Sequence, residues 1–147
     1  MTRTQISTLI GLLITALCAG PVAAVPDTIH IVSRLDPNAI IITEVDIVCI
    51  YDAELAAGFP ATKKDWYSAK FMLTRNAGDK LDIVNTFVPQ GFDTVDPPLP
   101  ERLKQAKRIL VFARHDDSET PAFDITDYSG ALIEIDQFGI RVSDPTH

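Results

Sequence analysis

Cysteine is scarce in this chain, which has two cysteines among 147 residues. Cys18 lies within an N-terminal apolar run, and Cys49 is the only cysteine of the chain that follows that run. A single thiol cannot form an intramolecular disulfide, so the fold must depend on packing. Because Cys49 stands between Val48 and Ile50, we interpret it as a small buried hydrophobic residue rather than a reactive thiol.

Histidine is equally scarce, and the three histidines are His30, His115 and His147. None stands three or four positions from another histidine or from a cysteine, which argues against a zinc site. The chain also lacks the G-x-S-x-G, P-loop and G-x-G-x-x-G motifs. We therefore expect no catalytic residues, no cofactor and no enzyme activity. An enzyme whose site assembles across the fold without a sequence signature stays open as an alternative.

Basic clusters with interleaved aromatic residues are absent, and the formal net charge is −7. An acidic protein repels phosphate backbones, so we expect no nucleic-acid partner. The nearest approach to a basic cluster is Lys104, Lys107 and Arg108, which a solvated helix face explains.

Glycine is missing from positions 116–128, although this acidic stretch offers several carboxylate oxygens to a hard cation. A tight metal-binding loop would use glycine, and EF-hand spacing is absent. We interpret the carboxylates as solvated and predict no metal site. A calcium-binding or small-ligand-binding β-sandwich is the alternative, with the candidate ligands Asp116, Asp117, Asp124 and Asp127.

The N-terminal residues 1–24 have the three parts of an export signal. Arg3 precedes an apolar run over residues 9–19, and Val22 and Ala24 are small residues at positions −3 and −1 of a cleavage site. The run is shorter than the roughly 20 residues of a membrane-spanning helix. We expect an exported, periplasmic protein.

Cys18 introduces a second possibility for this segment. A lipoprotein signal places a small residue directly before the modified cysteine, whereas this chain has Leu17 there. We therefore interpret Cys18 as part of the apolar run. Lipidation of Cys18, which would anchor the protein to the outer membrane, is the alternative.

The remaining chain alternates between strand-like runs and turn signals, and the most strand-like run is Thr43–Asp52. Its Asp46 is expected on an outward face. These runs predict one mainly β domain over residues 25–142 with a frayed tail at 143–147: a transthyretin- or immunoglobulin-like antiparallel β-sandwich with one inserted helix. An α+β sheet with the helix over one face is the alternative. Strands are expected at residues 28–35, 40–51, 81–88, 108–114, 131–135 and 138–142, with a short one near 123–125.

The inserted helix is predicted over residues 63–75. Thr62 and Asp65 resemble a capping box at its start, and Gly78 supplies a stop after its end. We expect Trp66 and Tyr67 to pack this helix onto the sheet. Pro100 suits the start of a second, short helix that would end at Lys107.

Several short motifs follow one another along the chain. A strand that closes in Ile-Tyr is followed by a helical insertion with an aromatic start, a turn containing Pro and Gly, and a core strand that ends in Arg. Their positions are Ile50-Tyr51, Lys64-Asp65-Trp66-Tyr67, Pro89-Gln90-Gly91 and Ile109–Arg114. This succession of motifs resembles the outer-membrane lipoprotein family of type VI secretion systems.

The resemblance implies a non-catalytic scaffold, tethered to the outer membrane, that recruits the periplasmic part of an inner-membrane secretion protein. In that family a loop between the first strands contacts the partner, which implies partner-binding roles for Asp36, Pro37 and Asn38. This chain departs from the family at Leu17, where the lipidation motif is interrupted.

Overall fold

The computed structural model describes residues 24–35, 42–89, 95–115 and 119–145. Seven strands, two α-helices and two 3₁₀ turns are assigned within these residues. In chain order they are β1 (Ile29–Ser33), β2 (Ile42–Ile50), α1 (Ala53–Ala57), α2 (Lys63–Ala77), η1 (Gly78–Lys80), β3 (Leu81–Pro89), η2 (Leu103–Gln105), β4 (Arg108–Arg114), β5 (Phe123–Asp124), β6 (Ala131–Asp136) and β7 (Gly139–Ser143).

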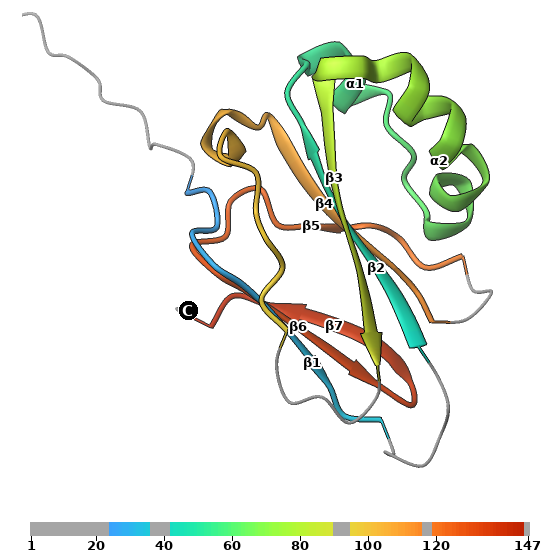
Figure 1. Cartoon of the computed structure of the whole chain (residues 1–147), viewed down its shortest axis with the longest axis vertical. Helices are drawn as coiled ribbons and strands as arrows, with labels where there is room; N and C mark the ends of the chain where they lie inside the picture. Colours follow the sequence, from blue (N-terminus) through green and yellow to red (C-terminus); the bar gives the residue numbers. More distant parts are fainter. Residues whose placement is uncertain (1–23, 36–41, 90–94, 116–118, 146–147) are drawn as a thin grey trace, which may run out of the picture.

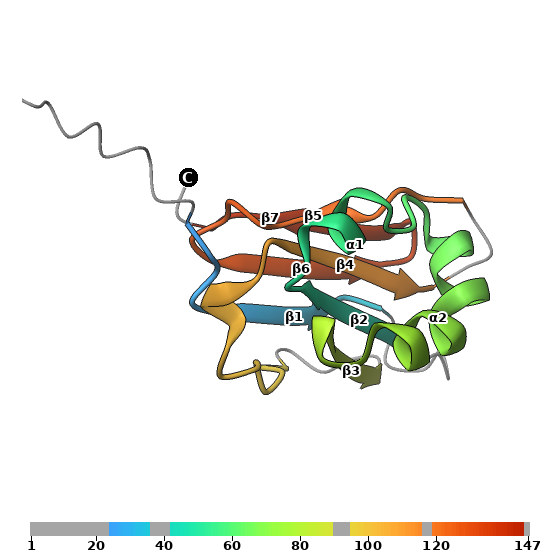
Figure 2. The same cartoon turned by 90° about the horizontal axis from the view of Figure 1, so that it is seen from above.

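The strands form two sheets, one of four strands in the order β3-β2-β4-β5 and one of three in the order β1-β6-β7. The two helices cover one side of the four-stranded sheet, and the three-stranded sheet lies on its other side (Figures 1 and 2). The predicted mainly β sandwich with an inserted helix is confirmed. The helix covers one face of a sheet, as the α+β alternative also required, so the molecule has three layers.

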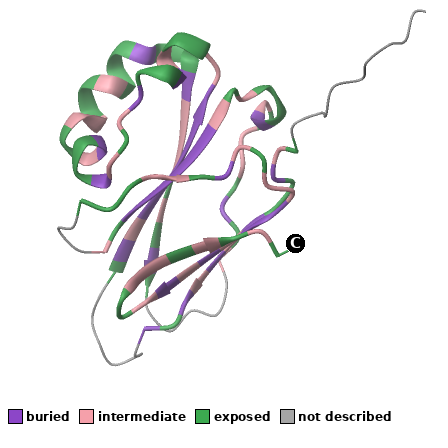
Figure 3. Ribbon diagram, turned by 180° about the vertical axis from the view of Figure 1, so that it is seen from behind, coloured by how far each residue is buried: buried purple, intermediate pink, exposed green. Residues whose placement is uncertain are grey.

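Strand β2 is the centre of this arrangement because both of its faces are buried. Val45, Ile47 and Cys49 face the three-stranded sheet and belong to the larger core cluster. Val48 and Ile50 face the helices and belong to the second cluster. Every residue from Val45 to Ile50 is buried, and Figure 3 shows burial concentrated in the strands while α2 is mostly exposed.

Helix α2 begins and ends where the local chemistry predicts. The Thr62 Oγ1 accepts a hydrogen bond from the Asp65 backbone N at 3.2 Å, and the Thr62 hydroxyl donates to Asp65 Oδ2 at 2.8 Å. At the other end Gly78 has φ +56°, a conformation in which a residue with a Cβ is strained. The inserted segment with α1 and α2 leaves the four-stranded sheet at the end of β2 and rejoins it at the start of β3, at the same end of the sheet (Figure 1).

One strand pairing differs from the expected antiparallel pattern, since β1 runs parallel to β6. The two strands are separated along the chain by the entire four-stranded sheet, so no tight turn forces them to be antiparallel. Strand β1 lies at the edge of the three-stranded sheet.

Two boundaries also differ from expectation. The second helix predicted from Pro100 to Lys107 is only a 3₁₀ turn over Leu103–Gln105. The tail expected from Ser143 begins later, because Ser143 closes β7 and Asp144 accepts a hydrogen bond from the Ser129 backbone N at 2.9 Å. Among the described helices, none is long and apolar enough to cross a membrane.

Candidate functional site

A carboxylate is buried at the junction of α2 and the four-stranded sheet. Asp46 is 0% exposed and lies beside Asn85 of β3 and Phe112 of β4, on the face of β2 that α2 covers. Trp66 Nε1 donates to Asp46 Oδ2 at 2.8 Å, while Lys70 Nζ and Asn85 Nδ2 donate to Oδ1 at 2.9 and 2.6 Å. Three donors, one of them the Lys70 cation, therefore compensate the buried acceptor, which would otherwise be costly.

Glu44 extends this cluster by one position on the same face of β2. Its Oε1 accepts from Lys70 Nζ and from Asn85 Nδ2, each at 2.8 Å. Burial opposes ionisation of Glu44, but the hydrogen bond from Lys70, its positive charge and the bond from Asn85 outweigh burial and lower the Glu44 pKa. Burial likewise opposes the charged form of Lys70, while the two carboxylates raise its pKa. Both groups stay ionised at neutral pH, so the cluster is a structural tie rather than a proton donor near pH 7.

Aromatic packing holds the same helix in place. The Trp66 ring stacks on Phe112 with centroids 5.3 Å apart and meets Phe59 at 5.4 Å. The prediction that Trp66 and Tyr67 pack α2 onto the sheet is confirmed, since the Tyr67 hydroxyl also donates to the Glu44 backbone O at 3.3 Å.

The expectation that Asp46 faces outward is wrong. Alternation along a strand does not separate inside from outside when both faces are buried. The signal that could have placed Asp46 is the spacing of Trp66 and Lys70, four positions apart on one helix, which offers an N–H and an ammonium together.

A second polar cluster closes the other end of β2. Asp82 accepts from the Tyr51 hydroxyl at 2.8 Å and from Arg102 Nε and Nη2 at 2.8 and 2.9 Å. The Arg102 guanidinium carbon lies 3.9 Å from the centroid of the Tyr51 ring. The hydrogen bonds from Arg102 lower the Asp82 pKa, whereas burial and the bond to Asp82 raise the Tyr51 pKa. The cluster fastens the segment before β4 to the sheet.

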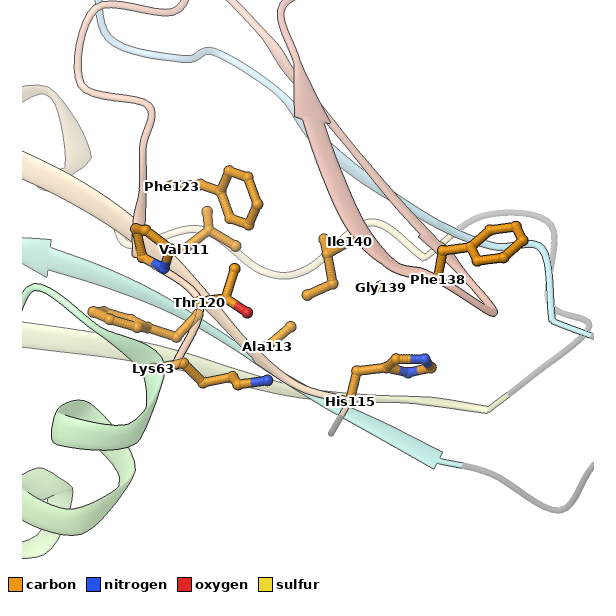
Figure 4. Close-up of a pocket in the computed structure, with 11 residues that line it drawn as sticks. Lys63, Val111, Ala113, His115, Thr120, Phe123, Phe138, Gly139 and Ile140 are labelled. Carbon is orange, nitrogen blue, oxygen red and sulfur yellow. The ribbon is translucent and has the colours of Figure 1, made fainter. Parts of the chain in front are cut away.

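A pocket of about 310 Å³ opens between the two sheets at the side where β4 and β5 face β7 (Figure 4). Its wall is part apolar and part polar, and Lys63 and His115 are titratable groups in its described lining. His115 Nδ1 lies 3.4 Å from Thr43 Oγ1. The lining residues are Lys63, Val111, Phe112, Ala113, His115, Thr120, Pro121, Phe123, Phe138, Gly139 and Ile140.

The thiol of Cys49 is not suited to nucleophilic chemistry. Its side chain is 0% exposed, and burial raises its pKa to about 12. Because the thiolate is the reactive form, Cys49 is a packing residue.

The candidate metal ligands do not converge in the part of the chain that is described. Asp124 lies in β5, where it accepts from Arg108 Nε at 2.8 Å and from the Thr126 backbone N at 3.1 Å. Asp127 follows in a turn, and no three His, Cys, Asp or Glu side chains gather around one point among the described residues. Other predicted positions lie outside the described residues: Cys18, Asp36, Pro37, Asn38, Asp116 and Asp117.

Comparison with known proteins finds a likeness among solved structures. No family model matches the chain, and no curated protein matches its sequence. A similar structure is that of Lip from Serratia marcescens, a membrane-bound component of the type VI secretion system. The likeness covers 81% of this chain and 97% of Lip at 15% identity, with a TM-score of 0.49. A TM-score below 0.5 carries no argument for a shared function.

Replacing Trp66 tests the buried hydrogen bond to Asp46. The substitution Trp66→Phe keeps an aromatic ring on Phe112 but removes the indole N–H, so we expect the free energy of unfolding to fall by about 1–3 kcal/mol. Tyr67→Phe is the matched control, because it removes only a longer bond at a half-buried position. Urea unfolding measures both variants. Equal losses of unfolding free energy in the two variants would show that the indole N–H contributes no more to stability than the Tyr67 hydroxyl does.

The lowered pKa of Asp82 predicts a pH-dependent contribution to stability. Because the folded-state pKa lies below the unfolded value of about 3.9, this contribution is present above that value and is lost as the pH falls through the folded pKa. We expect Asp82→Asn to be less stable than the wild type at pH 7, with a gap that narrows below about pH 4. Urea unfolding across this range measures the gap, with the exposed Asp79→Asn as control. A gap that does not change with pH would contradict the account.

Proposed function

We propose that the chain is a non-catalytic interaction component of a cell-envelope secretion assembly of the type VI kind. It acts in the periplasm or at the outer membrane and holds the periplasmic part of an inner-membrane secretion protein. The N-terminal pattern of residues 1–24 motivates the location, and lipidation at Cys18 would supply the anchor.

The observation that carries this proposal is where the motifs of the resemblance lie in the fold. Ile50 ends β2 and Tyr51 follows it, residues 64–67 lie at the start of the inserted helix α2, Pro89 ends β3, and residues 109–114 make up most of β4. The motifs thus follow the consecutive elements of the four-stranded sheet and its inserted helix in the order of the resemblance.

The physical design of the molecule supports a binding role. Strand β2 is buried on both faces, and α2 is tied to it by the bonds between Asp46, Trp66 and Lys70. A scaffold of this kind presents surfaces and edges in fixed positions, which lowers the entropic cost of binding a partner.

Co-purification from the native host tests the proposal. The full chain with a C-terminal tag is expressed from its own promoter, cross-linked in cells and purified from the envelope fraction, and captured proteins are identified by mass spectrometry. We expect an inner-membrane protein with a large periplasmic part, together with other secretion components.

An unrelated exported β-sandwich protein with the same tag controls for non-specific capture. The proposal fails if the folded, exported chain captures no inner-membrane protein beyond those found with the control.

A further inference from the structure

A depression runs along α2 where this helix overhangs β2 and the end of β4. Its volume is about 540 Å³. We call it the α2 groove and define it by its lining residues, which are Glu44, Tyr67, Lys70, Phe71, Thr74, Arg75 and Arg114.

The base of the α2 groove is fixed. Lys70 bonds to Glu44 and to buried Asp46, and the Tyr67 hydroxyl donates to the backbone of Glu44. The side chains at the base are therefore held in place before any ligand arrives, which reduces the cost of ordering them on binding.

The walls carry aromatic surface that the fold leaves in water. Phe71 is 75% exposed although it belongs to a packed helix, and Tyr67 beside it is half-buried. Phe87 is 62% exposed and stands opposite Glu44 on the same face of the sheet, which extends the apolar surface beyond the groove. Grouped exposed aromatic residues mark interaction surfaces in soluble proteins.

The charge of the α2 groove is opposite in sign to that of the chain. Arg75 and Arg114 are both exposed, and neither has an ion pair among the described residues. The Arg114 guanidinium carbon lies 5.7 Å from the centroid of the Tyr67 ring. Among the described lining residues Glu44 is the one carboxylate; it shares Lys70 with Asp46 and also feels the charge of Arg114. Arg75 and Arg114 thus place two guanidinium groups at the groove on a protein with net charge −7.

We propose that the α2 groove is the docking site for an acidic segment of a partner protein. Carboxylates of that segment bind Arg75 and Arg114, since a guanidinium pairs with a carboxylate through two parallel hydrogen bonds. A large apolar side chain between these carboxylates packs against Tyr67 and Phe71.

A segment fits this site better than an extended anionic surface does. Salt screens charges over about 8–10 Å, so the electrostatic attraction on a segment within the groove comes mainly from Arg75 and Arg114. A flat anionic surface would also meet the acidic remainder of the chain. The inference deepens the proposed function and rests on it, because it assigns the surface and the chemistry by which the partner is held.

Selection from a phage-displayed library of random 12-residue peptides tests the α2 groove without knowledge of the partner. We expect peptides enriched on the purified protein to combine Asp or Glu with a large apolar residue. For the strongest synthetic peptide, Arg75→Gln with Arg114→Gln should weaken binding at least about tenfold, because two charge-assisted contacts are lost. Phe71→Ala should weaken it several-fold, and added salt should weaken it for the wild type.

Matched controls separate the groove from general effects of charge or exposure. Lys107→Gln with Arg141→Gln removes the same charge from exposed positions elsewhere, and Met72→Ala truncates the exposed neighbour of Phe71. Both controls should bind the peptide within about twofold of the wild type, since substitutions at surface positions away from a binding site usually change its binding free energy little. Circular dichroism and urea unfolding verify that all variants fold.

The inference is overturned if no peptide is enriched, if enriched peptides lack acidic residues, or if the arginine double variant binds as well as the wild type. Failure here is distinguishable from failure of the proposed function. If the arginine double variant still captures an inner-membrane protein, the docking role of the α2 groove is rejected and the proposed function is not. Peptide binding in the groove without any envelope partner rejects the secretion role alone.

Discussion

The burial of Asp46 is the constraint on which the rest of the structure depends. A carboxylate with no exposed surface requires compensating donors, and the sheet itself supplies only Asn85. The other donors, Trp66 and Lys70, come from α2, so the charge at the centre of β2 is compensated only when the inserted helix lies in one place. Apolar packing of Trp66 on Phe112 favours the same position without fixing the helix to a single register.

The hydrogen bonds from Trp66 and Lys70 to Asp46 hold α2 against the four-stranded sheet as a third layer and determine which of its side chains face solvent. When α2 is fixed in this position, Lys70 pairs with Glu44 and Asp46. Phe71 and Arg75 of the same helix then face solvent beside Arg114. The buried polar cluster and the α2 groove are two sides of one arrangement. The pocket between the sheets, in contrast, is bounded by β4, β5 and β7, with Lys63 as the contribution of α2 to its described lining.

Much of the fold could be predicted because its signals are local. The Thr62 cap, the glycine stop at position 78 and the apolar runs of β2 and β4 each specify their element without tertiary information. The parallel pairing of β1 with β6 could not be predicted, because its partners, such as Ile29 and Ala131, lie too far apart along the chain to leave a turn signature. Asp46 was misplaced because polarity alone indicates exposure, and only its donors on α2 explain its burial. The groove combines residues 44, 67–75 and 114, which no spacing rule connects.

The most direct test of this account is a double-mutant cycle between Asp46→Asn and Lys70→Met, measured by urea unfolding at neutral pH. Asn can still accept from the Trp66 indole, but its amide NH₂ then faces the donors Lys70 and Asn85, so the cycle reports the charge pair together with the hydrogen bonds to Oδ1. Lys70→Met alone leaves the buried carboxylate with the bonds from Trp66 and Asn85 but without its cation, and should be the more destabilising single change. The account predicts that the double variant loses less stability than the sum of the single variants, by about 1 kcal/mol or more. Additivity within about 0.5 kcal/mol would show that the pair does not hold α2 on the sheet and would contradict the account.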